Sequence, residues 1–438
     1  MTPQSQREPV AEPSAPMRLY VHVVVVAMLA AVAVLGWLAV YMAVNRLLWD
    51  NDLVEANRWI VPVLVMPFSL LAGLLVKYRK APTNLDGSML DSLSGDPREI
   101  NWRGLPVNVL MAWTSLWSGA VLGPEGGIGG IASKLAALYG ERLRIPVELR
   151  SRLVFTALAS AYNGLVANPL FTGVLGTELV ADPASRTRTL PANLIGGSIG
   201  FLVFMVIGST GLQDYLHLTD SLPITPLDGV AVVAFGLVGM VCAAIMAAMF
   251  RVAEGVFGRL RGREVERALL AGLVFSVVGV AAPVLLASGE LQVGGIAANP
   301  GAYGPAVLVG MALAKLALLA VAFRSGFLGG PTFPAIFASV CVAEAACLLV
   351  PGLRVDIVIG GVTAGFLTVV FKAPFMVILL TSVMLDATPE VTALLTLAVA
   401  AVMIVMPSVR HAVEGRQARR GSGSQGGETA PNATSQGG

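Results

Sequence analysis

The sequence predicts an all-α membrane protein that crosses the bilayer many times through tilted and broken helices. Charged residues make up 13% of the chain, about half of the roughly 25% usual for soluble domains. Apolar residues make up 55%, and the mean hydropathy is +0.76. Two glycine clusters interrupt the apolar stretches. A chain of this composition leaves more apolar surface than one soluble core buries, whereas a bilayer solvates that surface and requires only that the backbone be satisfied internally.

Apolar stretches recur along most of the chain, and a helix needs about 17–25 such residues to span a bilayer. Two shorter stretches, Leu153–Ala167 and Phe375–Leu385, predict tilted or partial helices. The pattern indicates a multi-pass protein of the cell membrane, in contact with membrane lipids. The longer stretches are Tyr20–Met42, Trp59–Val76, Leu105–Leu122, Leu227–Met249, Ala268–Leu286, Pro305–Phe323 and Pro331–Leu349.

The two ends of the chain have a different composition from the middle. Residues 1–17 and 411–438 are rich in small and polar residues, which predicts disordered tails around one membrane domain at 18–410. Basic residues favour the cytoplasmic side of a membrane, so both termini are expected there. The basic clusters lie at Lys77–Lys80, Arg142–Arg152, Arg259–Arg267 and Arg410–Arg420.

The glycine clusters, Gly119–Gly130 and Gly326–Pro334, occupy matching places in an internal repeat. From Glu125 to Pro169 is 44 positions, and from Gly330 to Pro374 is also 44. A matched pair of interrupted apolar segments is typical of an internally duplicated transporter, with its site at the repeat interface. We place the half-repeats at approximately 60–210 and 225–406.

A membrane helix broken by glycine exposes free N–H groups at its new start. Those groups, with the positive end of the helix dipole, bind anions without a full positive charge. Gly126 and Gly127 would let an ion approach the backbone closely. Close helix packing through small residues explains glycines equally well, so the glycines alone leave both interpretations open.

Glu125 favours the anion site, because a carboxylate in mid-membrane costs roughly 2.5–3.5 kcal/mol on insertion scales and is usually functional. It lies between the helix breaker Pro124 and two glycines. A carboxylate there competes with an anion for the same amide donors when ionised, and leaves when protonated. It would therefore be a gate sensitive to pH and to anions; the alternative is a structural helix cap.

Five segments resemble the CLC family of chloride channels and transporters. Leu105–Val107 followed by Val121–Gly127 resembles its Leu-Pro-Val and gating-glutamate segments, with twenty residues from Leu105 to Glu125. Gly329–Pro334 resembles its Gly-Gly-x-Phe-x-Pro segment. Asn168–Glu178 and Lys372–Phe375 resemble its two Ala-Pro-Leu helices. The match spans roughly residues 60–410, nearly the whole membrane domain.

The resemblance implies an inverted internal repeat, a homodimer with one pore per subunit, and Glu125 as the gating glutamate. Asn84 stands where the family usually has an anion-binding serine, and its amide can also donate to an anion. Pro331 departs from the family because it has no N–H to donate, for which the Thr332 hydroxyl would compensate. The anion-binding residues implied are Asn84, Gly126, Gly127, Pro331, Thr332 and Phe333.

The choice between channel and exchanger depends on a second carboxylate. Family exchangers usually carry Glu-Glu where this chain has Glu178-Leu179. Leucine carries no proton, which favours passive conduction of small anions, most of all chloride. A chloride/proton antiporter remains an alternative, with protons as a second partner and Glu178 on the proton pathway. A fluoride-selective exporter is another alternative, because the positions of Asn84, Pro331 and Thr332 are altered.

An enzyme is the competing class, and the sequence disfavours it. The chain has three histidines and no His-Glu-x-x-His, nucleophile elbow or phosphate loop. We expect no metal, no cofactor and no nucleic-acid partner. Lys315, inside an apolar stretch, either raises the local potential for anions or is neutralised by pairing or snorkelling.

Overall fold

The computed structural model describes residues 17–49, 54, 56–84, 100–178, 183–208 and 223–424, and side chains as far as residue 408. These residues are almost entirely helical, and the only β pairing among them is a single bridge between Gly123 and Gly330. Most of the predicted N-terminal tail and Leu179 lie outside the described residues. The all-α prediction is confirmed.

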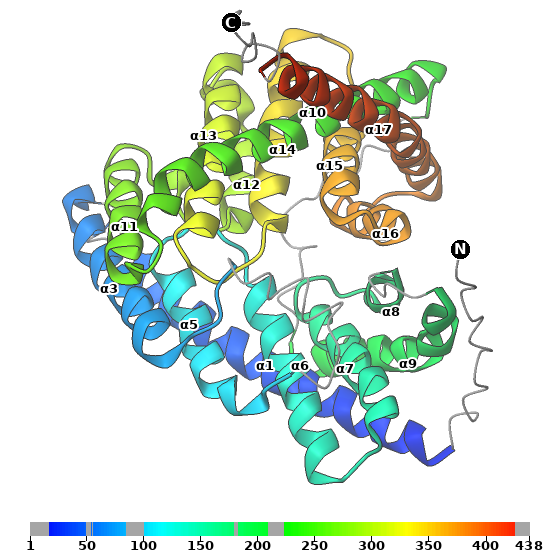
Figure 1. The fold of residues 1–438 in the computed structure, drawn as a ribbon. Coiled ribbons are helices and arrows are strands. Elements are labelled where there is room, and N and C mark those ends of the chain that lie inside the picture. The colour runs from blue at the N-terminus through cyan, green and yellow to red at the C-terminus, as the bar shows by residue number, and fades with distance from the viewer. Residues whose placement is uncertain are drawn as a thin grey trace, which may run out of the picture.

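The first half of the chain forms one side of the molecule, coloured blue to green in Figure 1. Its long first helix packs against the helices that follow the first glycine cluster. The helices are α1 (Met17–Trp49), α3 (Val61–Arg79), α5 (Leu105–Trp117), α6 (Glu125–Arg142), α7 (Val147–Ala161), α8 (Pro169–Glu178) and α9 (Pro183–Ile207).

The second half, green to red in Figure 1, forms the other side. It contacts the first half where α3 packs on α11 and where α8 meets α16. The helices are α10 (Pro226–Phe257), α11 (Glu264–Ala281), α12 (Glu290–Ala298), α13 (Pro305–Arg324), α14 (Thr332–Leu349), α15 (Val355–Phe371), α16 (Pro374–Met384) and α17 (Pro389–Ser424).

Short 3₁₀ turns join several of these helices, mostly at proline and glycine. They are η1 (Arg58–Ile60), η4 (Trp102–Gly104), η5 (Tyr162–Gly164), η7 (Gly258–Leu260), η8 (Pro283–Leu285) and η9 (Pro300–Ala302).

Helix length separates the membrane-spanning helices from the partial ones. Seven helices in the described part of the chain are long and apolar enough to cross a membrane. The 33 residues of α1 extend about 50 Å at 1.5 Å per residue, well beyond a hydrocarbon core of about 30 Å. Such a helix either tilts or extends beyond the hydrocarbon core at its ends. With 10 and 11 residues, α8 and α16 reach only about half the core. The sequence predicts this for Phe375–Leu385, in α16, whereas the other predicted short stretch, Leu153–Ala167, falls mostly in α7.

The helices after the two glycine clusters follow the same order. The lengths of α6, α7 and α8 are 18, 15 and 10 residues, and those of α14, α15 and α16 are 18, 17 and 11. The long helices α9 and α17 follow them. The structure extends α17 to Ser424, past residue 410 where the sequence predicts the C-terminal tail to begin. The exact bounds of the half-repeats stay a prediction.

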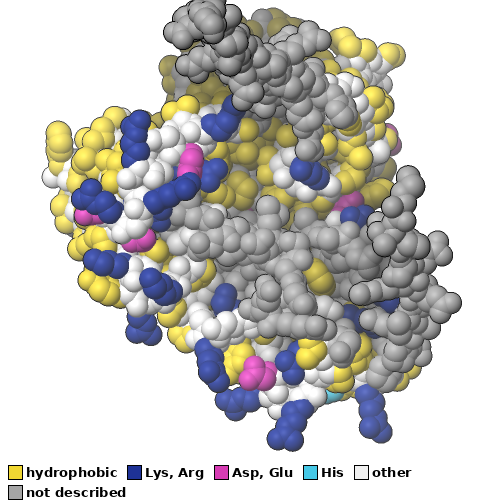
Figure 2. Space-filling model, in the orientation of Figure 1, with side chains coloured by type: hydrophobic (Ala, Val, Ile, Leu, Met, Phe, Trp, Pro, Cys, Tyr) yellow, Lys and Arg dark blue, Asp and Glu magenta, His cyan; other side chains and the backbone are white. Residues whose placement is uncertain are grey.

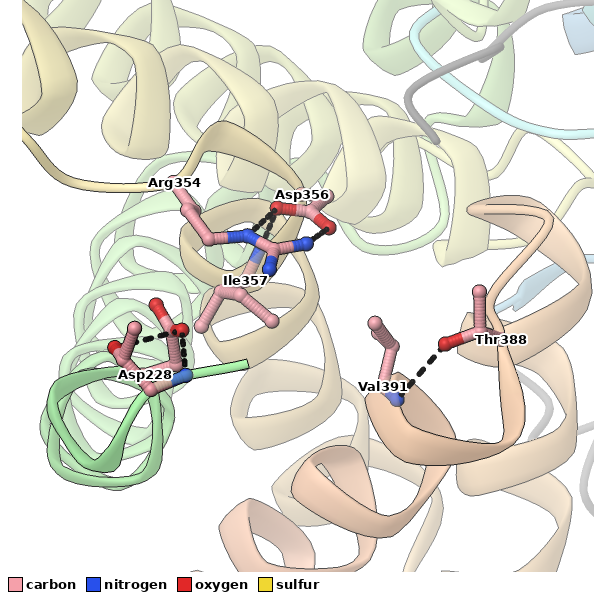
Figure 3. Close-up of polar contacts among 7 residues, drawn as sticks. Asp228, Arg354, Asp356, Ile357, Thr388 and Val391 are labelled. Carbon is pink, nitrogen blue, oxygen red and sulfur yellow. Dashed lines mark hydrogen bonds and ion pairs between the residues drawn. The ribbon is translucent and has the colours of Figure 1, made fainter. Parts of the chain in front are cut away.

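Polar contacts cap the starts of α10 and α15, both in the second half of the chain (Figure 3). At the start of α10, Asp228 Oδ2 accepts from the backbone N–H of Thr225 at 2.8 Å. At the start of α15, Asp356 accepts from the Arg354 guanidinium at 2.6 Å and from the N–H of Ile357 at 2.9 Å. These contacts satisfy N–H groups that a helix start leaves unpaired.

Candidate anion-binding site

The loops before α6 and α14 meet at the middle of the molecule. The N–H of Gly123 donates to the carbonyl of Gly330 at 2.8 Å, and the N–H of Gly330 donates back to Gly123 at 2.8 Å. This paired contact holds the two helix starts together. The two glycine clusters, 207 positions apart when counted from Gly123 to Gly330, therefore build one site at the interface of the repeats.

Both helices begin directly after a proline. Helix α6 begins at Glu125 with Pro124 as its N-cap, and α14 begins at Thr332 with Pro331 as its N-cap. Neither proline makes a side-chain cap, so the first N–H groups of each helix need another acceptor. Because Pro331 has no N–H, Thr332 supplies the first donor of α14.

Glu125 provides that acceptor. Its side chain is buried, with 2% exposed, and its Oε1 accepts from the N–H of Thr332 at 3.1 Å. Oε2 is buried and has no hydrogen-bond partner among the described residues. A carboxylate from one helix start is thus bound by the donors of the other, with half of its acceptor capacity unused.

The room for this carboxylate exists because both loops carry glycine. A methyl carbon on Gly123 would lie 2.0 Å from Oε2 of Glu125, and one on Gly330 would lie 2.2 Å from it. Ordinary contacts between such atoms are longer than about 3 Å. Any side chain at Gly123 or Gly330 would therefore collide with Glu125 in this position.

Asn84 lies beside the same loop. Its Oδ1 accepts from the N–H of Gly329 at 3.3 Å, and its backbone N–H donates to the carbonyl of Phe327 at 3.4 Å. Its Nδ2 is buried without a hydrogen-bond partner in the described part of the chain. That N–H₂ group is a donor available to a ligand.

The other predicted residues divide between the site and the surrounding packing. Gly126 lies against the site loop, since a methyl carbon there would be 3.0 Å from the Cα of Gly329. Gly127 faces away, and a methyl carbon there would lie 2.6 Å from the Trp37 ring of α1. Close helix packing therefore accounts for Gly127. Phe333 is buried in the apolar core, 6% exposed.

Tyr162, which the sequence analysis does not single out, also contacts the site. It is buried in the turn after α7, and its hydroxyl donates to the backbone carbonyl of Glu125 at 3.2 Å. This hydrogen bond ties the start of α6 to α7. No motif around Tyr162 indicates the contact, which depends on how α7 packs beside α6.

Glu178 lies elsewhere, at the contact between α8 and α16. Its two carboxylate oxygens accept from the N–H of Phe375 at 3.1 Å and from the N–H of Met376 at 2.7 Å. Both donors belong to the first turn of α16, where an acidic group is favoured by the helix dipole. The structure thus gives Glu178 the role of a helix cap that joins equivalent helices of the two repeats.

Lys315 is fully buried in α13 and bound to the backbone. Its ammonium donates to the carbonyls of Leu285, Leu286 and Ala287 at 3.2, 3.1 and 2.9 Å. Glu290, at the start of α12, interacts electrostatically with both Lys315 and Glu125. These three contacts give Lys315 a structural role at the turn of residues 285–287.

The described residues contain no group of three or more His, Cys, Asp or Glu side chains arranged to hold a metal ion. The polar groups at the centre are amide donors, a hydroxyl and one carboxylate. Such a set suits a small anion rather than a cation.

Together, the broken helices and the carboxylate held between two helix starts define a helical membrane protein of ion transport. The family model described as voltage-gated chloride channel matches residues 68–406. The chain belongs to this family. Its members are ion channels and transporters, so the chain is not an enzyme.

Several proteins of similar sequence are named as ion-transport proteins. The ion-transport protein YfeO of Escherichia coli O139:H28 is 27% identical over 365 residues, covering 79% of this chain and 83% of that protein. YfeO of Escherichia fergusonii is 28% identical over 331 residues, covering 73% and 75% respectively.

Solved structures share the fold at low sequence identity. A slow cyanobacterial Cl⁻/H⁺ antiporter matches with a TM-score of 0.74 and 20% identity, covering 90% of this chain and 96% of that one. A CLC-type fluoride/proton antiporter matches with a TM-score of 0.66 and 18% identity, covering 89% and 95%. These likenesses confirm the predicted fold class.

Proposed function

We propose that this protein transports small inorganic anions, chloride foremost, across the cell membrane, and that Glu125 is the gate. One observation carries the proposal: the Glu125 carboxylate accepts from the Thr332 N–H at the meeting point of two helix starts. A chloride ion and a carboxylate are alternative acceptors for the same donors.

The donors lie along one short stretch of chain. When the carboxylate leaves, the N–H and hydroxyl of Thr332 are free to bind an anion. Asn84 Nδ2 offers a further donor beside Gly329, three residues before Thr332. Backbone and amide donors hold an ion without a fixed cation, so that the ion can leave again.

The protonation state of the Glu125 carboxylate controls the gate. A buried carboxylate oxygen without a donor, such as Oε2 of Glu125, is costly while the group is ionised. A proton removes the charge that the helix starts attract. The neutral side chain then binds the amide donors less well than an anion does, and an anion replaces it.

Passive conduction is the mode we favour. Glu178 has both oxygens engaged by α16, which supports a structural role for this carboxylate. The second candidate is proton-coupled exchange, favoured by similar structures that are described as Cl⁻/H⁺ and fluoride/proton antiporters. The second of these also favours fluoride as an alternative ion. A homodimer remains the assembly expected from the family.

The gate is tested by chloride efflux from proteoliposomes at several pH values. Wild-type efflux should rise as pH falls, because protonation releases Glu125. Efflux through Glu125→Gln and Glu125→Ala should be fast and independent of pH. Glu266→Gln, at an exposed carboxylate of α11, serves as the control and should behave as wild type. Normal pH dependence in both Glu125 variants would remove Glu125 from this role.

Proton coupling and anion selectivity each need a further measurement on the same vesicles. Under a pH gradient, a reversal potential that follows chloride alone supports conduction, whereas one that also follows protons establishes exchange. Chloride and fluoride efflux compared at equal gradients identify the preferred ion. Faster fluoride efflux would overturn the choice of chloride while leaving the Glu125 gate intact.

A further inference from the structure

A charged pocket lies where four helix ends come together on the basic face of the molecule. Figure 2 shows Lys and Arg side chains gathered over α3 and α11, with acidic side chains among them and hydrophobic surface beside them. The pocket has a volume of about 380 Å³, and its charged lining residues are Glu254, Arg261, Glu264, Arg267 and Arg324. By the positive-inside rule this face is cytoplasmic.

The charges in this pocket favour an anionic ligand. Glu254 is already compensated, because it pairs with Arg261 at 2.5 Å and with Arg324 at 3.3 Å. Glu264 lies at the start of α11, where the helix dipole offsets its charge. Arg267 is buried at 7% exposed and is the third guanidinium of the pocket lining. Each guanidinium has five N–H donors, so the pairs with Glu254 leave donors for another acceptor.

An apolar groove adjoins the charged pocket, and Phe257 lines both. The groove has a volume of about 550 Å³ and lies between α10, α11 and α13. Its wall is open to the surroundings, since Val252 is 72% exposed. The apolar residues of its lining include Ile245, Met249, Val252, Leu270, Val274 and Val321.

The length of the groove matches one leaflet of a membrane. From Ile245 to Phe257 the axis of α10 rises about 18 Å, and one leaflet contributes about 15 Å of a 30 Å hydrocarbon core. The charged pocket is at the end of this groove where the basic residues lie. A molecule with an acyl chain and an anionic headgroup has this same arrangement.

We propose that the groove between α10, α11 and α13, with the pocket of Arg261, Arg267 and Arg324, binds an anionic phospholipid of the cytoplasmic leaflet. The acyl chain lies along the apolar groove. The phosphate accepts hydrogen bonds from the arginines. Arginine pockets between membrane helices on this side recognise anionic headgroups, whereas a zwitterionic lipid would bring a like charge towards them.

Native mass spectrometry of the purified protein tests this site, with phosphatidylglycerol and phosphatidylethanolamine of the same acyl chains as probes. Wild type should retain phosphatidylglycerol more tightly, by roughly 10- to 30-fold for two arginines. The double variant Arg261→Gln, Arg324→Gln should lose the difference. The control Arg259→Gln, Arg263→Gln removes two charges from the same loop outside the pocket lining, and should keep it.

The apolar part of the site has its own variants. Ala317→Phe fills the groove from α13 and should weaken retention of phosphatidylglycerol. Leu313→Phe, one turn earlier on the same helix and outside the groove lining, should leave it unchanged. If the double arginine variant does not fold, Arg261→Gln alone carries the test, because its side chain is 77% exposed.

Three results would overturn the proposal. The first is equal retention of the two lipids by wild type. The second is an unchanged preference in the folded arginine variants. The third is displacement of phosphatidylglycerol by millimolar inorganic phosphate, which would make the pocket a site for soluble anions.

Discussion

Gly123→Ala should open the gate without touching Glu125. The added methyl carbon would lie 2.0 Å from Oε2, 2.6 Å from Cδ and 2.7 Å from Oε1 of Glu125. All three atoms belong to the flexible end of one side chain. Gly123 does not need the left-handed backbone region, so alanine keeps the pairing with Gly330 and the carboxylate must move.

The magnitude follows from the contact that is lost. A hydrogen bond to a charged group contributes about 1.5–3 kcal/mol, and the Thr332 N–H to Glu125 bond is of this kind. Its loss shifts the equilibrium between the site occupied by the Glu125 carboxylate and the site left by it. The equilibrium constant changes by about 10- to 100-fold, at 1.4 kcal/mol per factor of ten. Chloride efflux from proteoliposomes at neutral pH should rise towards that of Glu125→Gln and lose its pH dependence.

Gly310→Ala is the matched control, because a methyl group there meets nothing within 4 Å, and it should behave as wild type. A Gly123→Ala protein that folds and keeps wild-type efflux at every pH would refute the reasoning. That result would mean that the position of Glu125 against Gly123 does not control permeation.

Three further predictions concern residues around the gate. Asn84→Ala should weaken chloride binding by about tenfold, since it removes a hydrogen-bond donor. Asn84→Ser should restore part of the affinity. Equal chloride affinity of wild type and both variants by isothermal titration would exclude Asn84 from the site. Glu178→Gln should destabilise the protein by about 1 kcal/mol, the usual worth of a charged cap, without altering proton movement under a chloride gradient; altered proton movement would return Glu178 to the proton pathway. Lys315→Met leaves three carbonyls unpaired and should cost about 3 kcal/mol or more; an unchanged thermal midpoint in detergent would contradict this.

Much of the fold was readable from the sequence because bilayer physics limits the choices. Apolar length predicts the spanning helices, and proline with glycine predicts where they break. Pro124 and Pro331 mark the starts of α6 and α14. The equal spacing of 44 positions from Glu125 to Pro169 and from Gly330 to Pro374 indicates that the two segments correspond. The helix that continues to Ser424 was missed, because its polar composition resembles that of a disordered tail.

The site was less readable, because its contacts join residues far apart in the chain. Sequence reasoning identified Glu125 from the cost of burying a carboxylate, but not its partner atom on Thr332. It did not find Tyr162, whose hydroxyl contacts the backbone of Glu125 only because η5 packs beside α6. Gly127 was grouped with the anion site by its neighbours in sequence, whereas its open side faces Trp37 on another helix. Which neighbour such a glycine faces depends on the rotation of its helix about the helix axis.

The central claim is that the Glu125 carboxylate occupies a position that an anion takes when it leaves. A crystal structure of Glu125→Gln grown in bromide, with anomalous scattering data, measures this directly. The account predicts a bromide peak within hydrogen-bond reach of the Thr332 N–H, in the space bounded by Gly123 and Gly330. Bromide bound elsewhere in the protein, with that space filled by protein atoms, would contradict it.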